Sequence, residues 1–327
     1  MRNINTKKKF LVSLVIPVYN TAYYLAKALQ SVQDQTFRDF QAIIINDGST
    51  DESLQIIERF AIKNKNFRII NQKNKGLSAT RNRGIKASNS EFITFMDSDD
   101  FIEPDYLEEL YNTAIKYQAD IVCCNFCFYY PQMKIKVKWP FPALPGVYSN
   151  ERALKKITSC IGIFNFVWNK IFRKELFTKN NIKFSNMHYE DCAISPVLFF
   201  YAKKVAIIPN VLYNYVMRSS SITHAISASK INDSIRAIKI IRDFYENKGI
   251  LLKFRRRLKG HAKRFGVISC YNVFMMHLRS KNFKGFLKNI HSVRRSIKSI
   301  IFDKVRDYNK KNDILKGSYL VIDPEKK

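Results

Sequence analysis

The chain has 327 residues, of which 46% are hydrophobic and 13% aromatic, so it can bury a sizeable core and is not a disordered protein. Its 56 Lys and Arg against 27 Asp and Glu give a net charge of +29, which favours nucleic acid, anionic lipid or phosphorylated small molecules as partners without choosing among them. No run approaches the roughly 18–20 apolar residues of a membrane-spanning helix, and the six cysteines lack the spacing of a disulfide framework. We therefore expect a cytoplasmic protein.

The first 125 residues alternate short apolar runs with helical patterns. Leu25, Ala28 and Leu29 recur at the spacing of a helix packed on a sheet, with Asn20 placed to cap that helix. Pro104 is expected in the first turn of a later helix. Strands alternating with helices predict an α/β fold whose sheet is mostly parallel, with helices on both faces. The predicted strands are 11–16, 40–45, 67–70, 92–96 and 120–124, and helices are predicted at 52–62, 77–87 and 104–116.

The remainder of the chain is less regular and then strongly basic. Residues 131–148 contain four prolines and a glycine, which predicts a loop or hairpin. A helix is expected at 190–201, and strands at 205–208 and 211–217. Residues 225–327 hold 26 basic and 8 acidic side chains around apolar positions at helical spacing. We expect a domain over 1–224, with halves of about 1–125 and 126–224, and a basic helical appendage over 225–327.

The Cys124-x-x-Cys127 pair has no second Cys or His pair at zinc-ligand spacing and ends an apolar run. We interpret both residues as buried strand thiols.

Polar clusters follow three of the predicted strands. Ligands of open α/β sheets bind at the carboxyl ends of the strands, where strand order reverses. The first strand leads into residues 17–20, the second into 46–51, and the fourth into Asp97-Ser98-Asp99-Asp100. Three carboxylates within four residues repel one another unless a cation lies among them, and Mg²⁺ or Mn²⁺ prefers such oxygens together with phosphates. The alternative is a solvated acidic turn at the start of the next helix.

Two further segments suit a nucleotide. Asp47 can accept hydrogen bonds from a base or ribose, and its alternative is an Asx turn supported by Gly48. Gly76 is followed by Arg81 and Arg83 on the first turns of a helix, where backbone amides and guanidiniums suit phosphate. The alternative for this segment is a solvent-facing helix.

Residues 15–20, 45–51, 74–84 and 95–100 together resemble the inverting family 2 glycosyltransferases, which use nucleotide-diphospho-sugars and have the Rossmann-like GT-A fold. The resemblance covers about the first 220 residues. It implies transfer of a single hexose or N-acetylhexosamine from a UDP-sugar to a hydroxyl of a glycan acceptor, with Mn²⁺ or Mg²⁺ as cofactor.

The resemblance also assigns roles. Asp191 resembles the catalytic base, although a Glu190-Asp191 pair at a helix start is also explained by the helix dipole. Trp168 can stack on a sugar or pack in the core, and His188 and His224 are weaker candidates for the site. The resemblance assigns donor nucleotide binding to Pro17, Val18, Tyr19, Asn20, Asp47, Arg81, Asp97 and Ser98; metal binding to Asp99 and Asp100; diphosphate binding to Tyr215, Arg218 and Ser221; and acceptor or sugar binding to Trp168, Asn169 and Glu190.

The basic C-terminal region suggests a peripheral position on the inner face of the cytoplasmic membrane. Each basic residue near an anionic lipid surface contributes about 1 kcal/mol of attraction. Polymer-building members of the family commonly use acceptors linked to a polyprenyl diphosphate, as in capsule, lipopolysaccharide or teichoic acid synthesis. The alternative is a solvated basic surface.

Three other functions fit the sequence less well. A nucleotidyltransferase acting on sugar phosphates shares the need for metal and nucleotide but would release pyrophosphate. A basic nucleic-acid-binding protein is disfavoured because no recognised motif of that class is present, so no nucleic-acid partner is expected. Processive polysaccharide synthesis is disfavoured by the absence of a Q-x-x-R-W motif.

Overall fold

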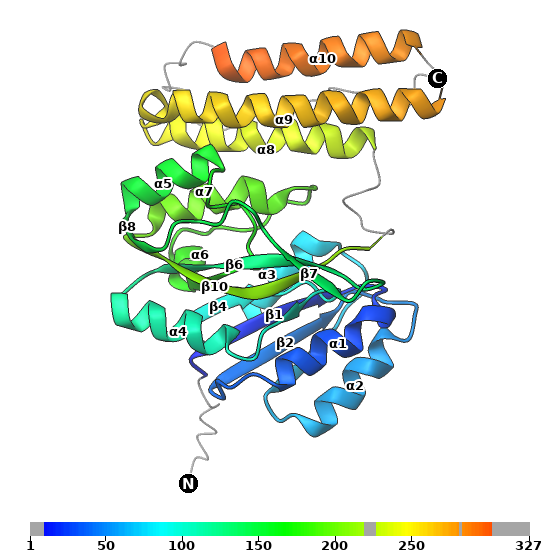
Figure 1. Cartoon of the computed structure of the whole chain (residues 1–327), viewed down its shortest axis with the longest axis vertical. Coiled ribbons are helices and arrows are strands. Elements are labelled where there is room, and N and C mark those ends of the chain that lie inside the picture. Colours follow the sequence, from blue (N-terminus) through cyan, green and yellow to red (C-terminus); the bar gives the residue numbers. More distant parts are fainter. Residues whose placement is uncertain (1–9, 219–226, 281–282, 303–327) are drawn as a thin grey trace. The chain divides into compact units, whose positions relative to one another are not determined.

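The computed structural model describes residues 10–218, 227–280 and 283–302 (Figure 1). The chain divides into two compact units. The first comprises Met1–Ala153, Phe166–Asn186 and Leu198–Arg218, and the second comprises Leu154–Asn165, Met187–Val197 and Ser219–Lys327. The appendage expected from the composition therefore shares its unit with two shorter segments from earlier in the chain.

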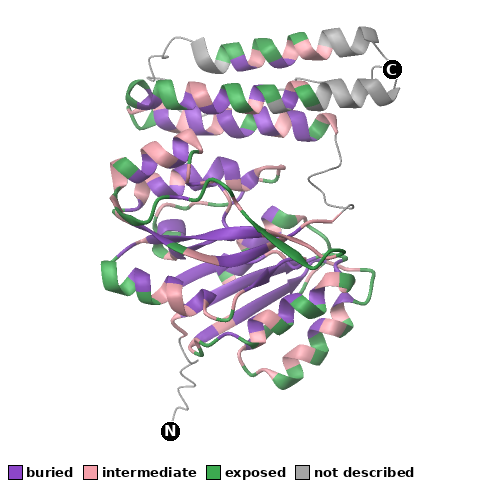
Figure 2. Ribbon diagram, viewed as in Figure 1, coloured by how far each residue is buried: buried purple, intermediate pink, exposed green. Residues whose placement is uncertain are grey.

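The first unit is built on a sheet whose first four strands are parallel. They alternate with helices and lie in the order β3-β2-β1-β4. Every residue of β1 is buried, as expected for a parallel strand covered on both faces (Figure 2). These elements are β1 (Val12–Val18), α1 (Ala22–Gln33), β2 (Phe40–Asn46), α2 (Ser53–Lys63), β3 (Phe67–Asn71), α3 (Leu77–Ala87) and β4 (Phe92–Phe95). The predicted α/β fold with a mostly parallel sheet is confirmed.

The sheet continues beyond β4 with mixed directions. Strand β9 (Lys170–Arg173) lies antiparallel between β4 and β6 (Ile121–Tyr130), and β10 (Lys204–Val216) runs parallel to β6. The short β5 (Phe101–Ile102) pairs antiparallel with β10 and precedes α4 (Tyr106–Tyr117).

The proline-containing segment 131–148 forms two sheet pairings, in agreement with the hairpin interpretation. Strand β7 (Ile135–Lys138) pairs with β6, and β8 (Gly146–Ser149) pairs with β10, both antiparallel. The helices α5 (Asn150–Ser159) and α6 (Glu175–Lys179) complete this part of the chain.

Three details of the predicted elements are wrong. Asn20 does not cap α1, because its Oδ1 accepts a hydrogen bond from Thr50 N at 2.8 Å, while Asp51 Oδ2 accepts one from Ala22 N in the first turn at 3.0 Å. Pro104 lies before α4 rather than in its first turn, where its carbonyl accepts a bond from Thr36 N at 2.9 Å. The two strands expected within 205–217 are one strand, β10, with irregular pairing after Ile207.

The second unit is helical. Its long helices are α8 (Ala228–Asn247), α9 (Leu251–Ser280) and α10 (Phe283–Phe302), and α9 contacts both of the others. Ile235, Ile238, Ile241 and Tyr245 form a buried stripe on α8, as their spacing predicts. The predicted helical character is therefore confirmed over the described part of this region, residues 227–280 and 283–302. Within the described ranges, no helix combines the length and apolarity needed to cross a bilayer.

The cysteines of β6 are buried thiols, as predicted. Cys123, Cys124 and Cys127 are each at most 3% exposed and unpaired by disulfides. Burial raises the pKa of Cys123 to about 11, so this thiol stays protonated and unreactive at neutral pH.

Candidate active site

Three polar segments meet at the carboxyl edge of the parallel strands. Because β1 lies between β2 and β4, the residues that follow these strands are neighbours. Asn20 N donates to Ser49 Oγ at 3.1 Å, which joins the segments after β1 and β2. Thr21 Oγ1 donates to Ser98 Oγ at 3.0 Å, which joins the segments after β1 and β4. Among the residues predicted to bind the donor nucleotide, Pro17 and Val18 are the last two residues of β1, and Tyr19 is half exposed.

Asp47 holds the loop that leads into α3. Its Oδ1 accepts hydrogen bonds from Gln72 Nε2 at 2.7 Å and Lys75 N at 2.9 Å, and its Oδ2 accepts one from Gly76 N at 2.9 Å. A Cβ on the neighbouring Gly48, whose φ is +72°, would lie 2.8 Å from a backbone nitrogen of this loop. The Asp47 carboxylate therefore orders the loop at Lys75 and Gly76, which precedes the helix predicted to bind phosphate. The contact predicted between Asp47 and a nucleotide base stays a prediction.

Arg81 and Asp97 form a buried ion pair. Arg81 Nη2 lies 2.7 Å from Asp97 Oδ1, with the arginine side chain 2% exposed and the aspartate 26% exposed. Helix α3 can bring Arg81 this close because Gly84 packs directly on β1: a Cβ there would lie 2.3 Å from a methyl carbon of Val15. The two residues predicted to bind the donor nucleotide are thus in direct contact, and of the two side chains the Asp97 carboxylate keeps the larger solvent-accessible surface.

Asp99 is paired with Arg218, 119 positions later in the chain. Arg218 Nη2 lies 2.6 Å from Asp99 Oδ2. Burial raises the pKa of Asp99, and the charge of Asp97 raises it further, whereas the charge of Arg218 lowers it. The predicted metal ligand and the predicted diphosphate residue therefore lie in direct contact. Ser221, predicted beside Arg218, and His224 lie outside the described residues.

Asp100 is fully engaged by β10. Tyr213 Oη donates to its Oδ2 at 2.7 Å and Val216 N donates to its Oδ1 at 2.8 Å, and the residue is 2% exposed. This geometry favours a structural role over the predicted metal-binding role. Tyr213 also accepts a hydrogen bond from Asp97 N at 3.2 Å, so it supports two members of the acidic cluster. Sequence reasoning missed Tyr213; its place two residues before the predicted Tyr215, on the same strand face, was the available signal.

The predicted acceptor residues Trp168 and Asn169 are buried. The Trp168 ring is 4% exposed and stacks on Tyr213, with centroids 4.4 Å apart. Asn169 Nδ2 donates to Cys124 O at 2.8 Å. Trp168 therefore lies in the aromatic core, as its packing alternative predicts, while Tyr215 remains half-buried with its ring centroid 5.9 Å from that of Trp168. A contact of Trp168 or Asn169 with a sugar stays a prediction.

Glu190 and Asp191 begin helix α7 (Glu190–Tyr201), as predicted, and belong to the helical unit. Glu190 is 6% exposed, and Asp191 is half-buried with its Oδ1 accepting a bond from Cys192 N at 2.7 Å. The preceding segment is fixed by α8, because Asp233 Oδ2 accepts a bond from His188 N at 2.9 Å and lies 2.8 Å from His188 Nδ1. The expected meeting of Asp47, Asp99 and Asp191 in one pocket stays a prediction.

Asp99 offers the donor chemistry that a hard divalent cation needs. It is a mostly buried carboxylate whose ionised form is disfavoured by burial and by Asp97, so a cation beside it would stabilise the charge. Within the described ranges, no three His, Cys, Asp or Glu side chains are grouped to hold a metal. A cation at Asp99 would therefore complete its coordination with substrate phosphates and water, as Mg²⁺ commonly does.

The chain is similar in sequence to known proteins. Residues 13–181 match the family model described as glycosyl transferase family 2. A cholesterol galactosyltransferase of Borreliella burgdorferi is 34% identical over 250 residues, which cover 74% of this chain and 69% of that protein.

Solved structures share the fold at low sequence identity. The crystal structure of S. aureus TarS 1-349 in complex with UDP-GlcNAc has a TM-score of 0.60 and 17% identity, covering 89% of both chains. The mannosyltransferase PcManGT from Pyrobaculum calidifontis, in complex with GDP-Man and Mn²⁺, has a TM-score of 0.55 and 14% identity, covering 81% of this chain and 72% of that chain. With a family match over half of its length, this chain belongs to glycosyl transferase family 2 and is a glycosyltransferase.

Proposed function

We propose that this enzyme is an inverting, metal-dependent glycosyltransferase that moves a single hexose or N-acetylhexosamine from a UDP-sugar to a hydroxyl of a lipid-linked glycan acceptor. The observation that carries the proposal is the shared strand edge at which Asp47, Arg81–Asp97 and Asp99–Arg218 come together. The UDP-GlcNAc complex of TarS supports a UDP-sugar as the donor class.

The donor nucleotide would lie across the ends of β1, β2 and β4. The backbone at Pro17 and Val18 would face the base together with Asp47, whose side chain already holds the loop before α3. The exposed part of the Asp97 carboxylate would accept hydrogen bonds from the ribose or sugar while the ion pair with Arg81 holds it in place. Tyr19, Asn20 and Ser98 would line the same edge.

Asp99 would hold the divalent metal, Mn²⁺ or Mg²⁺, and the Mn²⁺ complex of the P. calidifontis mannosyltransferase supports this choice. Such an ion, when bound, neutralises the charge that develops on the leaving diphosphate. Arg218 would then exchange its bond to Asp99 for the diphosphate, with Tyr215 and Ser221 beside it.

Asp191 would remove the proton of the acceptor hydroxyl as that oxygen attacks the anomeric carbon. One base acting opposite one leaving group gives a single displacement, and therefore inversion at that carbon. Glu190 would position the acceptor, and general-base help of this kind contributes about 10²–10⁴-fold to the rate.

The acceptor is proposed to be lipid-linked, and the enzyme to act peripherally at the inner face of the cytoplasmic membrane in the synthesis of a surface glycan. The name of the B. burgdorferi relative supports a lipid-type acceptor, because it is a cholesterol galactosyltransferase. The basic helices α9 and α10, which contain Arg255-Arg256-Arg257 and Arg294-Arg295, suit an anionic surface.

The test is a screen of the purified full chain against UDP-sugars and GDP-sugars, with Mn²⁺, Mg²⁺ or EDTA. We expect one UDP-sugar to be consumed with release of UDP, and EDTA to stop the reaction. Release of pyrophosphate would instead identify a nucleotidyltransferase. Turnover that is unchanged in EDTA would contradict the metal at Asp99.

A further inference from the structure

The segment that runs from the end of β6 into β8 exposes many apolar side chains. We call residues 131–148 the hairpin segment. Its alternation of apolar residues and lysines gives β7 two different faces. The exposed large apolar residues of the segment are Met133 (61%), Ile135 (48%), Val137 (46%), Phe141 (71%), Leu144 (68%) and Val147 (44%). A cluster of this kind on a protein surface marks an interaction site.

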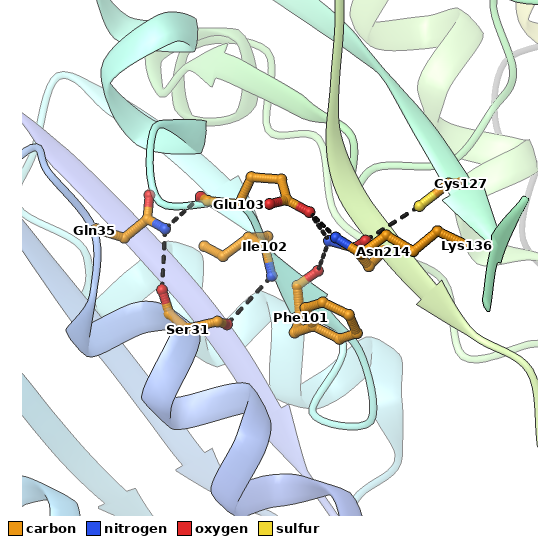
Figure 3. Close-up of polar contacts among 8 residues, drawn as sticks. All are labelled: Ser31, Gln35, Phe101, Ile102, Glu103, Cys127, Lys136 and Asn214. Carbon is orange, nitrogen blue, oxygen red and sulfur yellow. Dashed lines mark hydrogen bonds and ion pairs between the residues drawn. The ribbon is translucent and has the colours of Figure 1, made fainter. Parts of the chain in front are cut away.

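The lysine face of β7 is anchored to the body of the unit. Lys136 Nζ lies 2.5 Å from Glu103 Oε1, which also accepts a bond from Asn214 Nδ2 at 2.8 Å (Figure 3). A hollow of about 490 Å³ on this side is lined by Glu103, Cys127, Lys136 and Lys138, among others. Burial would raise the pKa of Glu103, but bonds from Lys136 and Asn214 lower it below its ordinary value, so the anchoring carboxylate is ionised at neutral pH.

The apolar face of β7 is continuous with aromatic rings of the sheet. Cross-strand partners project to the same face, and Val137 is paired with Phe128. The centroid of the Phe128 ring lies 6.0 Å from that of Tyr215 and 5.8 Å from that of Trp139. Trp139 in turn lies 6.1 Å from the exposed Phe141. A row of rings therefore runs from the candidate diphosphate residue Tyr215 to the exposed end of the segment.

The charges of the segment favour a lipid surface over a second copy of the chain. Residues 131–148 contain three lysines and no acidic residue. Among the described strands, β7 pairs with β6 alone, so its outer edge is open. Pairing that edge with its counterpart in another copy would bring lysines against lysines, which is how natural edge strands avoid such pairing. Anionic headgroups would attract Lys134 and Lys138, which are exposed at the two ends of β7, while Lys136 keeps its pair with Glu103.

We propose that the hairpin segment inserts its apolar face into the headgroup region of an anionic lipid bilayer. Trp139 and Phe141 are then at the depth where aromatic side chains are enriched in membrane proteins, with Lys134 and Lys138 at the phosphates. The next step rests on the proposed function: contact with the bilayer would bring a lipid-linked acceptor along the row of aromatic rings toward Tyr215. Insertion of the hairpin segment is distinct from charge attraction by α9 and α10, which needs no apolar insertion.

The first experiment uses the native fluorescence of the full chain. The protein has two tryptophans, Trp139 in the hairpin segment and the buried Trp168. Vesicles of phosphatidylcholine and phosphatidylglycerol with bromine on the acyl chains should quench the emission, and the Trp139→Phe variant should lose that quenching. Vesicle-bound protein without quenching would show binding through charge alone and would overturn the proposal.

The second experiment measures flotation with the same vesicles without bromine. The variant Ile135→Ser/Val137→Ser/Phe141→Ser removes apolar groups that are already exposed, so its circular dichroism should match the wild type. We expect its vesicle affinity to fall about tenfold or more, since each lost apolar contact weakens partitioning. The matched control is Tyr23→Ser/Ile62→Ser/Ile115→Ser, whose side chains are 86%, 85% and 47% exposed and lie on helices away from the hairpin segment in the sequence. This control should bind vesicles as the wild type does.

Equal affinity of the triple variant and the wild type would overturn the proposal. A second result would also overturn it: the wild type sediments as a dimer, the triple variant does not, and neither protein binds vesicles. The apolar face of the hairpin segment would then be covered by a second copy of the chain. Vesicle binding needs no sugar donor, so an enzyme that fails the donor screen can still pass this test, and the reverse also holds.

Discussion

Arg218 Nη2 lies 2.6 Å from Asp99 Oδ2. Arg218 lies two residues beyond the end of β10, and Asp99 belongs to the acidic cluster after β4, so this ion pair joins the two segments. In the absence of a donor, the two groups proposed for the diphosphate and the metal thus neutralise each other. Binding of the donor with its cation would replace this internal pair by two new ones, Asp99 with the cation and Arg218 with the diphosphate. This proposed exchange would keep the charge of the site balanced before and after the donor binds.

The Asp99→Asn variant should lose transfer by about 10²-fold or more, because an amide is a poor ligand for the cation that we propose stabilises the leaving group. UDP release measured against Mn²⁺ concentration checks this. Asp34→Asn, on the exposed end of α1, is the matched control and should behave as the wild type does. Wild-type activity of Asp99→Asn would remove this residue from metal binding.

The Asp191→Asn variant should bind UDP as the wild type does yet transfer sugar about 10²–10⁴-fold more slowly, because the amide cannot accept the acceptor proton. Calorimetric titration with UDP and a transfer assay measure the two properties separately. A normal transfer rate would show that the base is another residue.

Asp233 is expected to act as a positioning residue for the segment that leads into Asp191, because it holds both the backbone and the ring of His188. The Asp233→Ala variant should lower kcat by about tenfold while the KM for the sugar donor stays unchanged, since hydrogen bonds to a charged partner are worth about 1.5–3 kcal/mol. The control is Asp243→Ala on the same helix, where the aspartate pairs with Arg242 instead. Equal kcat in both variants would contradict the positioning role.

His261 of α9 should make the helical unit acid-sensitive. It is fully buried, and burial, with the charge of Arg264 acting in the same direction, lowers its pKa to about 4. A folded-state pKa below the unfolded value of about 6.5 means that the unfolded chain binds the proton more readily, so stability falls as the pH drops from about 6.5 toward 4, by up to about 3 kcal/mol.

Thermal unfolding of the wild type and of His261→Leu across this pH range measures that effect. The variant should lose less stability in acid than the wild type, and His291→Leu, at an exposed position of α10, should follow the wild type. Parallel curves for His261→Leu and the wild type would contradict the prediction.

The parallel half of the sheet was predictable because local signals and tertiary packing agree there. The runs that form β1 to β4 are short and apolar, and Leu25, Ala28 and Leu29 mark the buried face of α1. Strand β9 was missed because its position between β4 and β6 comes from pairing with segments far away in sequence. It also begins with the buried Lys170, whose Nζ donates to Asn169 Oδ1 at 2.7 Å, and a lysine in a core strand has no local signature.

The candidate site was predictable as a set of residues but not as a set of contacts. Asp97, Asp99 and Asp100 follow one strand, yet they have three different partners: Arg81, Arg218 and Tyr213. The bond between Tyr213 and Asp100 spans 113 positions, and such pairs follow from the packing of β5 against β10 rather than from any pattern along the chain. The same packing encloses Asp100, whereas Asp99 contacts Arg218, which lies beyond the end of β10.

The bonds from Asp47 to the loop before α3 have a consequence for how tightly a nucleotide can be held. Ordering a loop consumes conformational entropy, and here that loss is already incurred when the chain folds, through Lys75 N and Gly76 N. A ligand arriving at this edge then meets rigid amides, so more of its contact energy remains as affinity. Asp47 thereby influences ligand affinity through rigidity, independently of any contact that its own oxygens make.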